Sequence, residues 1–171
     1  IIPFLIINFI LIHRHYNSVA SQLRVDEVPP EPITSHVKQS ILLFVPMAAV
    51  NKATLRTLEY ALSLGLPVTV IHVAETVEAG QEFEKELRAW WPSARVVVIE
   101  SPFRALIGPL VAYLDSVHER EPERTLTVVI PEFLPAHWWE YPLHNQTALR
   151  LKAALLFRQG IAVVSVPYHL R

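Results

Sequence analysis

From residue 41 onward, short apolar runs alternate with longer segments that have helical periodicity. Unbroken apolar runs are typical of strands buried on both faces of a sheet, and the segments between them place apolar residues three and four positions apart, as in amphipathic helices. The pattern predicts strands at 41–46, 67–74, 94–99, 125–130 and 161–166, and helices at 51–64, 77–91, 103–119 and 145–158.

This alternation predicts an α/β fold, a three-layer sandwich with helices on both faces of a five-stranded parallel sheet, as in Rossmann-like proteins. We expect the strand order 3-2-1-4-5. That order puts the topological switch point between the first and fourth strands, where such sheets bind ligands at the carboxyl ends of the strands.

Several residues predict where the helices begin and end. Asn51 is an expected N-cap, and Gly65 an expected stop, for the first helix of the alternating region. Ser101 is the expected N-cap of the helix at 103–119. Pro109 inside that segment predicts either a kink or the true start of the helix.

The start of the chain has a different character. Residues 1–12 are almost entirely apolar, and His13, Arg14 and His15 follow them. Since basic residues mark the cytoplasmic side of a membrane segment, we expect residues 1–24 to be a short helical stub, the end of a transmembrane helix with its juxtamembrane continuation. The alternative is a buried N-terminal element of a soluble fold. Three prolines within residues 29–32 predict an extended linker over 25–36, so the folded domain is expected at 37–171.

Charge and cysteine content exclude some classes of function. The net charge of −1 gives no basic excess for a nucleic-acid partner. Cysteine is absent, which rules out disulfides and thiolate chemistry. There is no Gly-x-Ser-x-Gly, Walker or Gly-x-Gly-x-x-Gly sequence, so no enzyme activity is predicted.

Two loops meet at the predicted switch point, residues 46–51 after the first strand and residues 131–144 after the fourth. The second loop is long, which is common for functional loops. It ends at Asn145, where a helix N-terminus can bind an anion. His72 is expected to be a packed core residue that faces the edge of the crevice. The candidate ligand-binding residues are Pro46, Met47, His72, Val73, Arg104, Pro131, His137, His144, Asn145 and Thr147.

A metal site in the second loop is a weaker reading. His137, Glu140 and His144 are spaced three and four apart, but prolines break the helical register and no His-Glu-x-x-His pattern is present. We therefore predict no metal.

The sequence also resembles known families. The order of the segments 41–46, 69–73 and 128–131 is similar to the universal stress protein fold. The chain is similar to the cytoplasmic C-terminal tail of APC-superfamily permeases, the group that includes KimA-type potassium importers and amino acid permeases. The residues that carry this resemblance are His15-Tyr16, 19–23, 101–104, 129–133, 137–139, 143–148 and Val166-Pro167-Tyr168.

The resemblance implies a membrane-tethered regulatory and dimerisation domain on the cytoplasmic side of the cell membrane, joined to a transmembrane domain in the same polypeptide. It suggests cyclic di-AMP or another adenine nucleotide as ligand, with Arg104 stacking on or pairing with it. Nucleotide-binding universal stress proteins usually carry an Asp after strand 1 and a Gly-rich phosphate loop after strand 4. Here Pro46-Met47-Ala48 and a loop without glycine stand at those places, so ATP is not an expected ligand.

Two classes of function remain. The first is this transporter domain, which we expect to be a homodimer because its fifth strand and Val166-Pro167-Tyr168 leave a sheet edge that proteins usually cover. The second is a free-standing soluble nucleotide-binding protein of the universal stress type.

Overall fold

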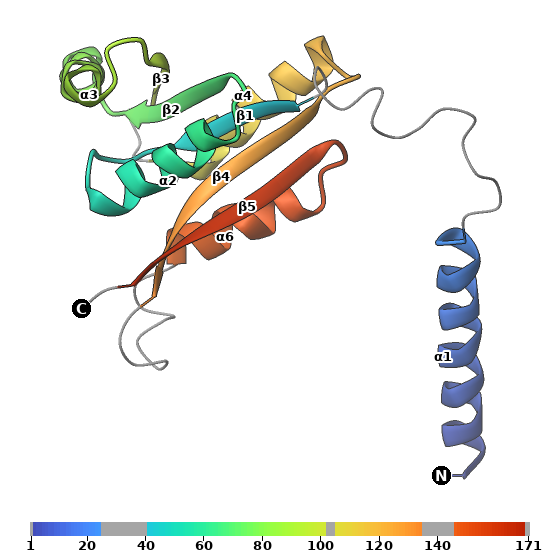
Figure 1. Ribbon diagram of the computed structural model, residues 1–171. Coiled ribbons are helices and arrows are strands. Elements are labelled where there is room, and N and C mark those ends of the chain that lie inside the picture. Colours follow the sequence, from blue (N-terminus) through green and yellow to red (C-terminus); the bar gives the residue numbers. More distant parts are fainter. Residues whose placement is uncertain (1, 25–40, 102–104, 135–145, 170–171) are drawn as a thin grey trace. The chain divides into compact units, whose positions relative to one another are not determined.

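The computed structural model describes residues 2–24, 41–101, 105–134 and 146–169 (Figure 1). It divides into two compact units, Ile1–His36 and Val37–Arg171. The elements are α1 (Ile2–Gln22), β1 (Ile41–Pro46), α2 (Lys52–Ser63), β2 (Val68–Ala74), α3 (Val77–Trp90), β3 (Arg95–Glu100), α4 (Ile107–Arg120), β4 (Thr125–Leu134), α6 (Gln146–Leu156) and β5 (Ile161–His169).

The first unit contains α1, whose apolar side chains are exposed; Phe4, for example, is 70% exposed. Its sequence contains no glycine, and its one proline, Pro3, lies in the first turn, where a missing N–H costs nothing, so no residue interrupts the helix. Among the helices described, none is both long and apolar enough to cross a membrane.

The second unit is a five-stranded sheet of order β3-β2-β1-β4-β5 in which every neighbouring pair is parallel. The predicted fold class and strand order are therefore confirmed. One cluster of buried side chains joins the sheet to α2 and α3, and another joins it to α4 and α6, so helices cover both faces (Figure 1).

The fourth strand is longer than the sequence suggested. Residues 131–134, expected in a loop, continue β4 and pair with 166–169 of β5. β1 ends at Pro46, so β4 and β5 run on together past its carboxyl end (Figure 1). Pro131 has no N–H to donate, yet it does not end the strand, because β4 no longer has β1 beside it at this point.

Helix ends follow the sequence in one case and depart from it in another. Asn51 caps α2, and Gly65 follows the end of that helix with a φ of +67°, both as predicted. The prediction that Ser101 caps a helix over 103–119 is wrong. α4 begins at Ile107, and Ser101 Oγ donates to the carbonyl of Ala105.

Substitutions of the two helical glycines are expected to differ in their effect on stability. A Cβ on Gly80 of α3 would lie 2.5 Å from Val98 Cγ1 of β3, whereas a Cβ on the exposed Gly108 of α4 would meet nothing within 4 Å. Alanine favours helix over glycine, but Gly108 precedes Pro109, whose ring disfavours helical backbone at a residue that carries a Cβ. Gly108→Ala is therefore expected to change the free energy of unfolding by less than about 0.5 kcal/mol. Gly80→Ala is expected to destabilise it by about 1–3 kcal/mol, because the helix must move off the sheet. Urea unfolding of the two variants checks this, and equal shifts of the same sign would contradict the close packing of α3.

Candidate functional site

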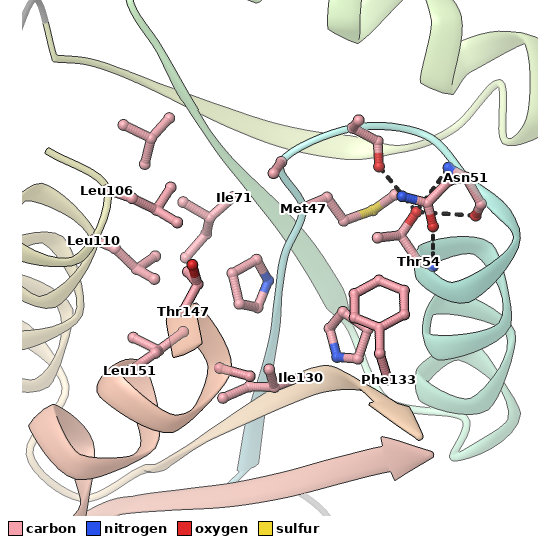
Figure 2. A pocket seen from close by; sticks show the side chains of 16 residues that line it. Met47, Asn51, Thr54, Ile71, Leu106, Leu110, Ile130, Phe133, Thr147 and Leu151 are labelled. Carbon is pink, nitrogen blue, oxygen red and sulfur yellow. Dashed lines mark hydrogen bonds between the residues drawn. The ribbon is translucent and has the colours of Figure 1, made fainter. Parts of the chain in front are cut away.

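A cavity of about 320 Å³ lies at the carboxyl ends of the central strands, at the switch point between β1 and β4 (Figure 2). Its walls come from the loop after β1, the first turn of α2, the end of β2, the first turns of α4 and α6, and the end of β4. The lining residues are Pro46, Met47, Ala48, Ala49, Asn51, Thr54, Ile71, Val73, Leu106, Leu110, Ile130, Pro131, Phe133, Thr147, Ala148 and Leu151.

Half of the ten residues predicted from the sequence line this cavity. These are Pro46, Met47, Val73, Pro131 and Thr147. Four others, Arg104, His137, His144 and Asn145, lie outside the residues that the structure describes, as does Glu140 of the possible metal site. The tenth is His72.

His72 is not among the lining residues. Successive side chains of a strand point to opposite faces, so Ile71 and Val73 face the cavity and His72 faces α3. Its ring stacks on Phe83, with ring centroids 3.8 Å apart. The residue is 7% exposed, so the expectation of a packed core histidine is correct, but the ring does not face the edge of the crevice.

The loop after β1 is fixed by a reciprocal set of hydrogen bonds at the start of α2. Asn51 Oδ1 accepts from the amides of Ala53 and Thr54, both at 3.0 Å, and Thr54 Oγ1 accepts from the Asn51 amide at 2.9 Å. This capping box satisfies donors that an uncapped helix would leave free. The first turn of α2 therefore has few free amides to offer a phosphate.

The opposite wall is formed by β4 and α6, which an ion pair ties together. Lys152 Nζ lies 2.6 Å from Glu132 Oε2, and the two side chains are 28% and 14% exposed. Pro131 and Phe133, on either side of Glu132 in the strand, line the cavity, and α6 contributes Thr147 and two apolar side chains. The ion pair thus lies beside the wall and holds its two elements together.

Sequence reasoning missed the apolar wall. Leu106, Leu110 and Leu151 were placed in helices but not at the site, because helical periodicity shows which residues are buried and not which of them border a cavity. Phe133 was missed because its segment was taken for a loop. The sequence feature that could have pointed to them is their apolar character, in segments that begin or end beside the predicted switch point.

The described lining of the cavity is uncharged. None of the described residues that line it carries a formal charge, and their polar side chains are Asn51, Thr54 and Thr147. Within the described ranges, no group of three or more His, Cys, Asp or Glu side chains is placed to hold a metal ion. Such a surface suits a flat, neutral ring system with a few hydrogen-bonding positions.

Comparison with known proteins identifies the family. The sequence model described as "KimA potassium transporter C-terminal domain" matches residues 36–168. The chain belongs to the KimA C-terminal domain family. It is also 30% identical, over 171 residues and 99% of its length, to the protein named "Potassium transporter KimA" from Bacillus subtilis (strain 168). The resemblance to KimA-type importers seen in the sequence is thereby confirmed.

The match covers only part of that relative. The chain spans 27% of its length, a little more than a quarter. Membership of the KimA C-terminal domain family therefore concerns the sheet domain, of which residues 37–168 are matched. The matched region also contains every lining residue of the cavity.

Proposed function

We propose that this chain is a cytoplasmic regulatory domain of a potassium transporter, and that the cavity binds one adenosine half of a cyclic dinucleotide such as cyclic di-AMP. The observation that carries the proposal is the cavity at the switch point of the sheet, whose described lining is uncharged. Ligands of open parallel sheets bind at this position, and a regulatory domain needs a site for its signal.

The size of the cavity favours a nucleoside over a whole dinucleotide. At about 320 Å³ it is at the lower end of the range of about 300–1,000 Å³ for ligand pockets. A cyclic dinucleotide is two-fold symmetric, so one half would fill the cavity and the other would remain outside it, available to a second copy of the domain.

The end of β2 offers an edge for recognising a base. The last pairing of β1 with β2 joins Pro46 to Ile71, and the Met47 amide donates to the Ile71 carbonyl. Val73 lies two residues further on, so its backbone groups point the same way, past the end of β1 and toward the cavity. A backbone donor and acceptor on one residue match the donor and acceptor on the edge of adenine.

Triphosphate binding has less support. A triphosphate carries several negative charges, and no described residue of the lining carries a positive one. The capping box occupies the first amides of α2, which leaves the starts of α4 and α6 as the helix ends beside the cavity at which an anion would be stabilised. A cyclic dinucleotide has one negative charge per nucleotide, and that is a better match.

We assign the rest of the chain by the same reasoning. Residues 1–24 are the end of a membrane helix with its juxtamembrane part, 25–36 are a linker, and 37–171 are a universal-stress-protein-like domain. The exposed apolar side chains of α1 and the basic residues after its first turns support membrane tethering with the domain on the cytoplasmic side. The transport pathway then lies in a membrane domain of the same polypeptide.

The same proposal includes a homodimer. β5 is an edge strand of the sheet, since its only neighbour in the described sheet is β4. Unpaired edges attract another strand unless they are covered. A second copy of the domain at this edge would cover it and bring two cavities into one assembly.

Potassium flux tests the proposal. The polypeptide that contains this chain and its membrane domain is reconstituted in vesicles, and cyclic di-AMP is added on the side of the sheet domain. We expect the flux to change by at least about fivefold, the lower end of common allosteric couplings, and cyclic di-GMP to have a much smaller effect. Unchanged flux at a concentration that saturates binding would contradict the regulatory role.

A further inference from the structure

His72 is an unusual residue for its position. β2 is otherwise built of apolar side chains and one threonine. Among the described residues classed as buried, His72 is the one titratable side chain. A valine or isoleucine would fill such a strand position without burying a polar group. Packing alone therefore does not explain why a histidine stands here.

The hydrogen bond of the ring gives that reason. His72 Nδ1 lies 2.9 Å from the carbonyl oxygen of Met47, 25 residues away in the sequence. A carbonyl oxygen only accepts, so Nδ1 carries the proton and donates. The stack on Phe83, with an angle of 5° between the ring planes, fixes the orientation of the imidazole behind this bond.

Both backbone polar groups of Met47 are therefore hydrogen-bonded. Its N–H donates to the Ile71 carbonyl at 2.9 Å, and its C=O accepts from His72. Met47 is also a lining residue of the cavity. His72 thus contacts the cavity wall from the side opposite the cavity, on the face of the sheet that α3 covers.

The loop that begins at Met47 has a second anchor at its other end. Thr54 Oγ1 lies 2.9 Å from the Ala49 carbonyl, and the capping box holds Asn51. Ala48 lies between the two anchors, Ala49 accepts the second one at its carbonyl, and both residues line the cavity and are exposed. Two small exposed residues have little packing of their own, so the anchors decide their conformation.

We propose that His72 is a positioning residue for the cavity: it holds the 47–51 loop in its binding conformation before a ligand arrives. This inference rests on the proposed function, in which the cavity is the ligand site. A loop that is already ordered loses less conformational entropy on binding, so removal of the anchor weakens binding although His72 does not touch the ligand.

Two variants separate the hydrogen bond from the packing of the ring. His72→Phe keeps an aromatic ring beside Phe83 and removes the donor to Met47. His72→Asn loses the ring but places an amide N–H close to the position of Nδ1. A purely structural role in the core predicts that the Asn variant is the worse of the two, whereas the positioning role predicts that the Phe variant is.

The first readout needs no ligand. Amide hydrogen exchange at the two hydrogen-bonded N–H groups of the loop, those of Met47 and Asn51, is expected to rise about tenfold in His72→Phe in the 171-residue chain, in line with the loss of a buried hydrogen bond. It is expected to rise less than about threefold in His72→Asn, where an amide donor remains. Exchange is taken relative to the central amides of β4, which corrects for any global loss of stability.

The second readout is the affinity for cyclic di-AMP, which is expected to fall about tenfold in His72→Phe and to be largely kept in His72→Asn. Loop exchange that is unchanged in His72→Phe, or larger in His72→Asn, overturns the inference. If the native chain does not bind the nucleotide, the proposed function fails, and the exchange measurement still decides whether His72 positions the loop.

Discussion

Ala48→Phe is expected to lower the affinity of the chain for cyclic di-AMP by about hundredfold or more and to leave its stability nearly unchanged. Ala48 lines the cavity, and it is exposed, so a larger side chain at this position displaces no core residue. A benzyl group there competes with the bound base for a cavity of about 320 Å³. Overlap of this kind costs a few kcal/mol, and each 1.4 kcal/mol is about tenfold in affinity.

The matched control is Ala89→Phe. Ala89 is an exposed alanine of α3 and is not among the residues that line the cavity. The substitution adds the same group to the surface, so both variants are expected to unfold within about 0.5 kcal/mol of the native chain. Fluorescence titration with a labelled nucleotide measures the affinities. Equal affinities of the two variants would show that the ligand binds elsewhere.

Leu110→Ala has the second large expected effect, and it acts on stability and on binding together. Leu110 of α4 is fully buried in the cluster between the sheet and α4 and α6, and it also lines the cavity. Its truncation is expected to cost about 2–5 kcal/mol of unfolding free energy. It also widens the cavity, so the base loses contact with one wall and binding weakens by about tenfold.

Leu114→Ala is the control for this variant. Leu114 lies one turn further along α4 in the same cluster, is equally buried and does not line the cavity. We expect a similar loss of stability by thermal and urea unfolding, and an affinity within about twofold of the native one, since distant sites act nearly independently. A similar loss of affinity in Leu114→Ala would mean that the cavity senses global stability rather than local shape.

The order of the sheet could be predicted because it depends on features that a sequence shows directly. Unbroken apolar runs such as Ile41–Pro46 indicate buried parallel strands, and right-handed connections leave few ways to arrange five of them. The switch point follows from the order. Pro46, Val73 and Thr147 could therefore be assigned to the site from their places at the ends of predicted elements.

The errors have equally specific causes. The sequence analysis placed His72 at the edge of the crevice. Side chains alternate between the two faces of a sheet along a strand, but both neighbours of His72 are apolar, so the sequence does not show which face of the sheet His72 lies on. Ser101-Pro102 has the composition of a helix start, but α4 begins at Ile107 and has Pro109 in its first turn. That was the second of the two readings of Pro109, and it was the correct one.

The apolar wall of the cavity could not be predicted for a different reason. Leu106 and Leu151 are ordinary positions of predicted helices in the sequence, and they line the cavity together with residues from the ends of β1, β2 and β4 and from the start of α2. That arrangement is a property of tertiary packing. No local pattern in either helix encodes it.

Calorimetric titration of the 171-residue chain with cyclic di-AMP and, separately, with ATP tests the central claim most directly. We expect saturable binding of cyclic di-AMP, with a dissociation constant on the order of 1–10 µM, and a rise of the melting temperature with ligand concentration. We expect ATP to bind at least about tenfold more weakly. The absence of both heat and thermal shift with cyclic di-AMP, or low-micromolar binding of ATP, would contradict the assignment of the cavity to a cyclic dinucleotide.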